Sequence, residues 1–596
     1  MRYWSGRKIR LADRSRGSRR FGLILLCCLL LVGAAVALAR PVAADEDAPT
    51  LTVSGYIRNG HGEGIAGVIV DVSIIRQAGA VRLGPGRPTR SDEEGAYILR
   101  LSLTAQEVAA LRLSSAQVII SAGKPGYADE QATLQAARLA VEGNHFFSDA
   151  DIVLAHKPTP AVVLAAVVLI GVYLLISLER MHRTVAALLG AAVILAITHI
   201  AGHFNPDFVI LPFERAITYI DLNVIFLLMA MMVLVTITAR TGVFQWLAVV
   251  AFRLAKGSTW RLVVLLMIAT AVLSAFLDNV TTMLLVVPVT LEIAILLQLD
   301  AFSLLLPEVF ASNLGGAATL IGDPPNLLIG SYADLGFGAF LQYMLPASIL
   351  AMVGLIVMTR IMYAGRYPQS TPQETADLLA RLEREFSIKD PRTLRQALIV
   401  FAGIIILFLA SSALHMEPSV PALLGMALLL IWTEADIAEE LERVEWPSLL
   451  FFIGLFIVIG GAVETGVIEA LADALLTVAA GNLTVAVIVI VWGTALASMV
   501  IDNIPITATM LPVVAYLSQH IPGVQGVILF WALALGACFG GNGTIVGASA
   551  NIVTAGLAER AGYSLTFFQF TRKGLPVAIM SLVVATIWLL GILWLT

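Results

Sequence analysis

Charged residues and cysteines are both scarce in this chain. Asp, Glu, Lys and Arg make up only 13% of its 596 residues, whereas 58% are hydrophobic and the mean hydropathy is +0.88. A soluble protein of this composition would expose too much apolar surface, so the composition excludes that class and predicts many membrane spans. The three cysteines, Cys27, Cys28 and Cys538, offer neither a disulfide framework nor a zinc-binding spacing.

The first 44 residues have the order of an export signal. Basic residues fill positions 1–20, an apolar stretch runs from Phe21 to Ala39, and Ala43-Ala44 precede Asp45. This order predicts a signal sequence with a small-residue cleavage site. Because the apolar part is long for a cleaved signal, an uncleaved anchor is the alternative. Residues 1–44 are therefore a signal peptide or a signal anchor, and the segment after them is predicted to be exported.

Residues 50–155 alternate in a way that predicts strands. Val53–Ile57 and Gly67–Val72 alternate or are β-branched, and the turn residues around Asp92 lead into another strand, Ile98–Leu103. The block resembles the carboxypeptidase-regulatory-like β-sandwich. It contains no catalytic cluster, so we expect a small extracytoplasmic, periplasmic accessory domain.

The remainder of the chain consists of apolar segments with short connections. Spans are predicted near 161–179, 185–201, 220–239, 304–333, 340–364, 395–412, 420–433, 447–464, 525–557 and 571–595. Two further apolar runs, Leu262–Leu297 and Leu483–Tyr516, each have an Asp-Asn pair near the middle. A straight helix over the first run would be about 54 Å long, against a hydrocarbon core of about 30 Å. Each run must therefore fold back, either as two spans or as a re-entrant hairpin.

Two segments before these runs, 241–256 and 465–480, predict short interfacial helices. Lys and Arg gather on one side of the predicted spans, at Arg180, Arg183, Arg240, Arg253, Lys256, Arg261, Arg360, Arg366, Arg560, Arg572 and Lys573. The opposite loops, 334–339 and 413–419, contain neither residue. The positive-inside rule makes the basic side cytoplasmic. Residues 366–396 then form a solvated cytoplasmic linker between transport repeat 1 (161–365) and transport repeat 2 (397–596).

The two halves repeat a pattern of polar residues. Asp278-Asn279 is followed by a proline ten residues later, and Asp502-Asn503 repeats this arrangement 224 positions along the chain. Each pair precedes a Gly-rich interruption, Asn313–Asn326 or Gly540–Asn551. The charge distribution gives the two copies opposite orientations. Inverted repeats with broken helices are typical of secondary transporters that bind their substrate near the midplane.

These interruptions and hairpin tips predict the binding site. A broken helix frees carbonyl groups and exposes a helix N-terminus. Lone Asn or Thr residues are commonly helix–helix contacts, but an intramembrane carboxylate is costly and indicates function. Carboxylate, amide, hydroxyl and carbonyl oxygens suit hard cations or protons. The candidate substrate- and ion-binding residues are Asp278, Asn279, Thr281, Thr282, Asn313, Gly316, Thr319, Asp323, Asn326, Asp502, Asn503, Thr507, Gly541, Asn542, Thr544, Ser549 and Asn551.

Within this set, the two Asp-Asn pairs are the predicted Na⁺ ligands. Other polar residues are weaker candidates. Glu292 and Glu308 are expected either to line a path or to lie near a membrane edge, and Glu464 to be interfacial. The histidines near span ends are expected to be solvated; they are His199, His203 and His415.

The repeated segments resemble a known family. Ser274–Leu284, Gly315–Thr319 and Ile321–Asn326 are similar to the pink-eyed dilution P-protein group, as are Val444–Trp446, Ile501–Pro505 and Gly536–Asn551. That group stands with arsenite permeases and Na⁺/H⁺ antiporters in the ion transporter superfamily, whose members carry a citrate-transporter-like domain. The resemblance implies two inverted repeats, each with a re-entrant hairpin and a discontinuous helix, in a homodimer with elevator-like movement.

The sequence departs from one branch of that superfamily. Sodium-coupled dicarboxylate carriers have Ser-Asn-Thr at the hairpin tips, where this chain has Asp-Asn. A fixed negative charge repels a dianion unless a cation neutralises it, which disfavours sodium–dicarboxylate symport.

We therefore predict an all-α polytopic membrane protein with a small exported β-sandwich domain. Its predicted function is secondary active ion transport in the inner membrane, coupled to H⁺ or Na⁺. We expect a small ion as substrate, the lipid bilayer as surroundings, no nucleic-acid partner, no resident cofactor and no enzyme activity. An anion channel of the P-protein type and a sodium-coupled organic anion symporter are the alternatives. The substrate stays open among arsenite, sodium, and organic or inorganic anions.

Overall fold

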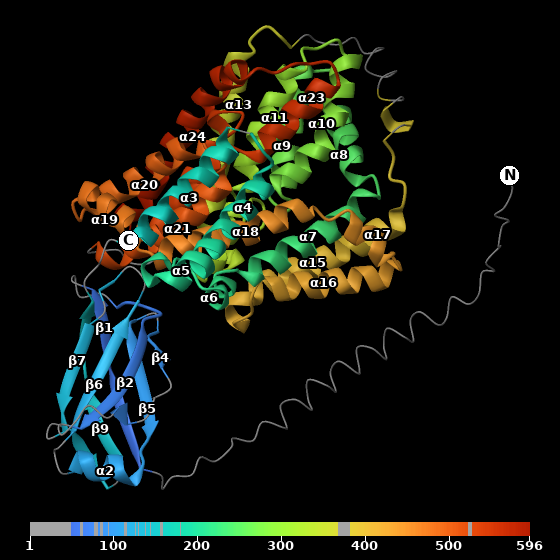
Figure 1. Ribbon diagram of the computed structural model, residues 1–596. Helices are drawn as coiled ribbons and strands as arrows, with labels where there is room; N and C mark the ends of the chain where they lie inside the picture. Colours follow the sequence, from blue (N-terminus) through green and yellow to red (C-terminus); the bar gives the residue numbers. More distant parts are fainter. Residues whose placement is uncertain are drawn as a thin grey trace, which may run out of the picture. The chain divides into compact units, whose positions relative to one another are not determined.

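The computed structural model describes residues 49–59, 64–76, 82–83, 88–92, 94–112, 116–124, 127–128, 130–136, 139–143, 145–154, 159–178, 180–367, 379, 382–384, 386–521 and 527–595. They divide into two compact units, the described residues of 49–123 with those of 129–154, and the described residues of 124–128 with those of 155–596 (Figure 1). The predicted signal segment, residues 1–44, lies outside the described residues.

The first unit contains two five-stranded sheets, which confirms the predicted β domain. In one sheet, β1 (Thr50–Asn59) pairs with β5 (Ala96–Ser102), β9 (His145–Asp149) and β10 (Ile152–Leu154), and β9 also pairs with β8 (Ala140–Glu142). In the other, β2 (Ile69–Arg76) pairs with β3 (Arg82–Leu83), β4 (Thr89–Arg90) and β6 (Ala116–Gly123), and β6 pairs with β7 (Glu130–Gln135). Alternate residues of β1, Leu51 and Val53 among them, are buried, as the period of a strand requires. A short helix that we did not predict, α2 (Ala105–Arg112), follows β5.

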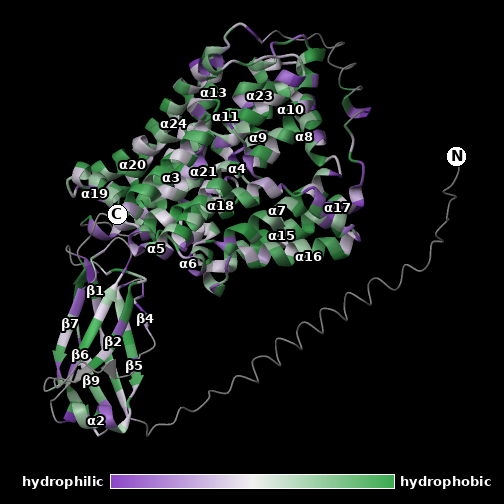
Figure 2. Cartoon of the chain, viewed as in Figure 1, coloured by the Kyte–Doolittle hydropathy of each residue, from purple (hydrophilic) through white to green (hydrophobic). Residues whose placement is uncertain are grey.

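The second unit is helical, and eight helices in its described part are long and apolar enough to cross a membrane. They are α3 (Pro160–Ser177), α4 (Arg183–Ala196) with the turns that continue it to Phe204, α7 (Leu222–Ala239), α10 (Asn279–Leu296), α13 (Phe337–Met362), α15 (Pro391–Leu414), α18 (Trp446–Glu464) and α24 (Phe567–Leu595). Figure 2 shows hydrophobic residues along these helices. The described connections include α5 (Gly202–Phe204), α6 (Phe213–Thr218) and α17 (Ile437–Glu442), and α16 (Ser419–Thr433) is a shorter apolar helix.

Both long apolar runs fold back at their Asp-Asn pairs, as predicted. The first run forms α9 (Thr259–Ser274) and α10, and the second forms α20 (Leu483–Ser498) and α21 (Asn503–His520). Asp278 and Asp502 are the N-caps of the returning helices and accept hydrogen bonds from backbone nitrogens three and two residues further on, respectively. A capping carboxylate satisfies donors that the first turn of a helix leaves free. The Asp residues therefore mark each turn for a local structural reason as well.

Both predicted discontinuous helices are interrupted. The first consists of α11 (Phe302–Gly316) and α12 (Pro324–Tyr332), and the second of α22 (Ile528–Gly540) and α23 (Ser549–Arg560). Glycine is required in each break by close backbone approach. A Cβ atom on Gly322 would lie 2.6 Å from two backbone oxygens, and one on Gly547 would lie 2.7 Å from the oxygen of Gly541.

Each hairpin packs against the broken helix of the other half. Helix α10 packs against α23, and α21 packs against α12. The segments predicted as interfacial form α8 (Val243–Ala255) and α19 (Val467–Ala479), which both contain 13 residues. Each follows a glycine with φ of 82°, Gly242 or Gly466. The halves thus match element by element, while their inverted orientation across a bilayer stays a prediction.

One expectation about a polar segment needs correction. The described part of the 366–396 linker is not simply solvated, because Leu382 is buried with residues of α8, α9 and α10, and the backbone nitrogen of Lys389 donates to the backbone oxygen of Thr241 at 2.8 Å. Glu308 is buried in α11, whose residues from Ser303 to Gly316 are all buried, and it accepts a hydrogen bond from Thr290. Its depth in a membrane stays a prediction.

The remaining weaker candidates lie near the expected positions. His199, His203 and His415 are exposed, and Glu292 is partly buried. Glu464 ends α18 and pairs with Arg215 at 2.6 Å.

Candidate ion-binding site

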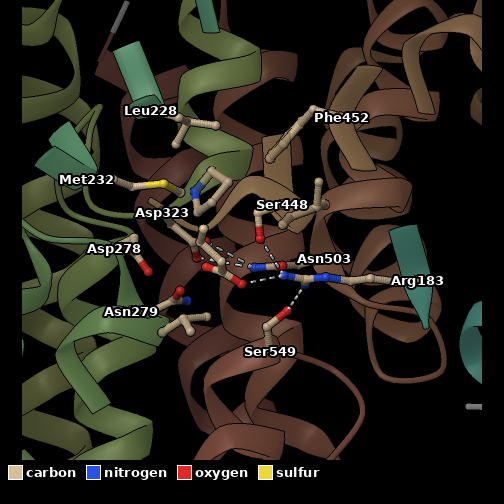
Figure 3. A pocket seen from close by; sticks show the side chains of 14 residues that line it. Arg183, Leu228, Met232, Asp278, Asn279, Asp323, Ser448, Phe452, Asn503 and Ser549 are labelled. Atoms are coloured by element: carbon tan, nitrogen blue, oxygen red, sulfur yellow. Dashed lines mark hydrogen bonds and ion pairs between the residues drawn. The ribbon is translucent and has the colours of Figure 1, made fainter. Parts of the chain in front are cut away.

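A small pocket lies where the two hairpin tips meet the break between α11 and α12. Asp278 and Asn279 of the first tip line it together with Asn503 of the second tip, Asp323 of the break, and Arg183 at the start of α4. In Figure 3, Asp278 and Asn279 lie to one side and Arg183 reaches in from the other. The cavity volume is about 30 Å³, which is enough for a water molecule or a small ion.

The pocket joins the two halves through an amide and a carboxylate. The side-chain nitrogen of Asn503 donates to both oxygens of Asp323, at 3.4 and 3.2 Å. Both side chains are buried. Asp323 is the N-cap of α12 but makes no side-chain cap hydrogen bond. Its carboxylate is therefore directed to the pocket and the second tip rather than to its own helix.

Asp278 is partly exposed to the same pocket and to a neighbouring apolar one. Its carboxylate accepts hydrogen bonds from the backbone nitrogen of Thr281 at 2.9 Å and from the hydroxyl of Thr281 at 2.5 Å. Among the described residues, neither Asp278 nor Asp323 forms an ion pair with a basic side chain. These two carboxylates can therefore accept an external cation or proton.

Asp502 has a different environment, because Arg183 reaches it. Arg183 Nη1 lies 3.5 Å from Asp502 Oδ2 and also donates to the hydroxyl of Ser549. Arg183 Nη2 donates to the Ser448 hydroxyl at 3.0 Å and lies 3.8 Å from a Glu445 oxygen. The Ser549 hydroxyl in turn donates to Asp502 Oδ2 at 2.5 Å. The second tip is thus paired with an internal cation, and the first tip is not.

A chain of buried amides lies beside the pocket. Asn279 donates to the side-chain oxygen of Asn313 at 3.3 Å, and Asn313 donates to Asn542 and Asn551 at 2.9 and 3.0 Å. The side-chain nitrogen of Asn542 has no partner among the described residues. A buried donor without a partner costs free energy, so this nitrogen can serve a water or a substrate oxygen.

The same side-chain contacts stabilise both helix breaks. Asn326 donates to the carbonyl oxygens of Gly316, Ala317 and Thr319, the last at 2.7 Å. In the second break, Asn551 donates to the oxygens of Gly541 and Thr544 at 2.8 and 2.9 Å. These amides replace the backbone donors that each interrupted helix lacks. We call Asn326 and Asn551 the break amides.

The threonines and glycines of the breaks are structural in their visible contacts. The hydroxyl of Thr319 donates to the oxygen of Ala275, and that of Thr544 donates to the oxygen of Met499 at 2.6 Å. These bonds attach each break to the end of α9 or α20. Gly316 and Gly541 lie against Gly322 and Gly547. Gly316, Thr319, Gly541 and Thr544 were predicted as ion ligands, and that role stays a prediction.

Of the seventeen predicted residues, five line the pocket, namely Asp278, Asn279, Asp323, Asn503 and Ser549, and the other twelve do not. Thr507 donates to the backbone oxygen of Asn503 within its own helix. Thr282 is buried, and its hydroxyl has no partner among the described residues. In the same described part, no group of three His, Cys, Asp or Glu side chains is arranged to hold a metal ion. A bound Na⁺ would therefore need amide or carbonyl ligands beside the carboxylates.

Three site residues were missed from the sequence. Arg183, a first-half residue, was counted only as a cytoplasmic loop charge, but it is partly buried and contacts Asp502 and Ser448 of the second half. Glu445 was quoted only for the family resemblance, and Ser448, also at the start of α18, was not considered. The sequence did contain a signal for Arg183. When Arg183–Gly190 is aligned with the matching segment of the second half, Pro418–Gly425, a charged residue stands where the other half has proline.

Sequence similarity places this chain among transporters. A family model described as "Citrate transporter" matches residues 173–536. The chain is 41% identical over 431 residues to a protein of Mycobacterium tuberculosis named as an uncharacterized transporter. The alignment covers 72% of this chain and 97% of that protein. It is 36% identical over 506 residues to the human P protein, covering 72% of this chain and 60% of that protein. The solved YdaH transporter of Alcanivorax borkumensis aligns with 70% of this chain and 99% of its own, at 14% identity and a TM-score of 0.48.

Proposed function

The chain belongs to the citrate transporter family, and we propose that this multi-pass membrane transporter of the citrate-transporter and P-protein type is a secondary active carrier coupled to H⁺ or Na⁺. The coupling cation binds in the pocket between the hairpin tips. Asp278 and Asp323 supply charge there, and Asn279 and Asn503 supply amide groups. The family relationship supports the transport activity, and the pocket supports the coupling.

The balance of charge at the pocket carries this proposal. Four carboxylates, those of Asp278, Asp323, Asp502 and Glu445, lie in or next to it with a single guanidinium, that of Arg183. Two unit charges 4 Å apart interact by about 4 kcal/mol at an effective dielectric constant of about 20. Uncompensated carboxylates inside a membrane protein are costly, so binding a cation or proton there is favourable. An anion channel through the same pocket is disfavoured for the same reason.

The size of the pocket limits what binds in this conformation. About 30 Å³ admits an ion or a water molecule, but not a tricarboxylate such as citrate. A larger anionic substrate would need a more open state and coupling cations to offset the carboxylates. We therefore assign the coupling ion to this pocket and leave the transported solute as a small ion or an organic anion.

The arrangement of the halves suits alternating access. Because each hairpin packs against the broken helix of the other half, both halves contribute to one central pocket. We propose that the protein resides in the inner membrane with residues 50–155 on the outer side, and that it acts as a homodimer.

Gradient-driven uptake tests this function. The full chain is reconstituted in proteoliposomes and assayed with arsenite, Na⁺ at alkaline pH, and dicarboxylates, under imposed H⁺ or Na⁺ gradients with a pH-sensitive dye. We expect saturable flux that requires one gradient and falls by about tenfold or more in Asp278→Asn and Asp323→Asn. Asp436→Asn, at an exposed N-cap where Asn also caps well, is the matched control.

Two outcomes would contradict the proposal. Flux that proceeds normally in both pocket variants would remove the carboxylates from the mechanism. Single-channel currents that persist without any coupling gradient would identify a channel instead.

A further inference from the structure

The two hairpin tips have equivalent sequences but unequal surroundings. Aligning the halves by their tips and breaks pairs Asp278 with Asp502. Three polar residues that contact Asp502 or its arginine have apolar counterparts in the alignment. The pairs are Arg183 and Pro418, Ser448 and Val224, and Ser549 and Pro324, whereas Glu445 corresponds to another carboxylate, Asp221.

The breaks differ in the opposite sense. Asp323 of the first break corresponds to Ala548 of the second. Asn313, the centre of the amide chain, corresponds to Cys538, whose thiol lies 3.7 Å from the side-chain oxygen of Asn326. Asp278 and Asp323 therefore have no basic partner among the described residues, while Asp502 has beside it an arginine that the first half supplies. The two halves therefore differ in the charges around their hairpin tips, although their backbone elements match.

Arg183 is held in place by several contacts. Its two terminal nitrogens face Asp502, Ser549, Ser448 and Glu445. Its guanidinium also lies 5.4 Å from the centre of the Phe451 ring. A guanidinium stays charged at any physiological pH and cannot dissociate from the chain. Three of its five N–H donors are directed to Asp502, Ser549 and Ser448 of the protein itself.

We propose that Arg183 is a tethered cation that permanently occupies the second of two equivalent acidic sites. It removes Asp502 from exchange with the solution and leaves one exchangeable site, at Asp278 and Asp323. Arg183 thereby sets the number of coupling cations per transport cycle. This inference rests on the proposed function. It names Arg183 as the residue that limits the protein to one exchangeable cation site.

The same contacts give Arg183 a positioning role. Through Asp502 and Ser549 it holds the second tip and α23, and through Ser448 and Glu445 it holds the start of α18. A small cation at Asp502 would form none of the contacts to α18. Replacing Arg183 by a neutral residue therefore has two separable effects, a freed carboxylate and a loosened contact with α18.

Cation binding to the purified full chain tests the proposal with two probes. Radioactive Na⁺ bound per chain is measured by equilibrium dialysis, and protons taken up per chain are measured by potentiometric titration. Arg183→Gln should raise the number of bound cations about twofold relative to the wild type, because Asp502 becomes a free site resembling Asp278. The double variant Arg183→Gln with Asp502→Asn should return to the wild-type number. A merely structural role for Arg183 would not produce this gain and its reversal.

The controls separate charge from folding. Arg183→Lys keeps the charge and should keep the wild-type number, and Arg180→Gln, at an exposed position three residues earlier, should bind as the wild type does. An unchanged number in a folded Arg183→Gln variant overturns the proposal, as does normal binding in Asp278→Asn. A different result would contradict the proposed function itself: the wild-type chain would then bind neither Na⁺ nor protons at this pocket.

Discussion

Asn503 donates from its side-chain nitrogen to both carboxylate oxygens of Asp323, at 3.4 and 3.2 Å. The amide belongs to the second hairpin tip and the carboxylate to the first helix break, so the contact crosses between the halves. Neither half has a complete pocket alone. This explains why two copies of one motif are retained in a single chain, and it makes the site sensitive to any change that separates them.

The break amides should stabilise the two halves to a similar extent. Asn326→Ala and Asn551→Ala each remove a donor from buried carbonyl groups, and a buried polar group left unpaired costs about 1–3 kcal/mol. We expect both variants to lower the thermal midpoint of the purified protein by similar amounts. A comparison with Asn482→Ala, which removes an exposed helix cap, distinguishes loss of a break from loss of a surface hydrogen bond. An effect in only one half would contradict the structural repeat.

Adding a methyl group inside a break should destabilise the protein. In Gly322→Ala and Gly547→Ala the new Cβ would meet backbone oxygens at 2.6 and 2.7 Å, and overpacking costs about 1–3 kcal/mol or more because backbone cannot swing aside. Gly556→Ala is the matched control, since nothing lies within 4 Å of its Cβ position in α23. Alanine is the better helix former by about 0.5–1 kcal/mol, so this control should retain or gain stability. Thermal unfolding in detergent measures all three.

The β domain should lose stability at high pH through Tyr97. Burial, together with the charges of Asp151 and Asp149, raises the pKa of Tyr97 to about 12, and its hydroxyl donates to the Ala150 oxygen at 2.7 Å. The unfolded pKa is about 10, so the folded state holds this proton more tightly. The contribution is complete below pH 10 and is lost as the pH rises from 10 to 12.

Urea unfolding of a fragment spanning residues 49–154, at several pH values, measures this dependence. Tyr97→Phe should remove it, and Tyr56→Phe, at an exposed position on β1, should leave it intact. An alkaline loss of stability that persists in Tyr97→Phe would assign the effect to another group.

Transport should not require the β domain. The strands form their own compact unit and contain no pocket residue of the candidate site. Deleting residues 50–155 while retaining the export signal should leave uptake in proteoliposomes unchanged. If uptake fell while the truncated protein remained folded, the domain would have a part in transport.

The membrane fold was predictable because the bilayer restricts it strongly. Runs such as Leu262–Leu297 are too long for one span, so their reversal at Asp278-Asn279 follows from length alone. The first break was predicted from Pro324 and Pro325, which favour the first turn of a helix over its interior, and both breaks were predicted from their glycines, which weaken a helix. Backbone constraints of this kind are local, and a sequence displays them directly.

The charge partners were not predictable by the same reasoning. Arg183 precedes Asp502 by 319 positions, and only tertiary packing brings them together. Its place at the start of a span also matched an ordinary cytoplasmic anchor, so the positive-inside rule concealed it. The burial of Glu308 was not predictable for a related reason, since hydropathy cannot distinguish a helix facing lipid from one enclosed by other helices.

The break amides have a consequence for how such a protein diversifies. Asn326 and Asn551 hold the interrupted backbone from the side, so the course of the chain does not depend on the residues that face the pocket. Positions such as Asp323 and Ala548 can then be exchanged without redrawing the fold around them. A few substitutions at such positions can then change the transported substrate while the fold stays the same. Related proteins can therefore share this architecture and transport different substrates.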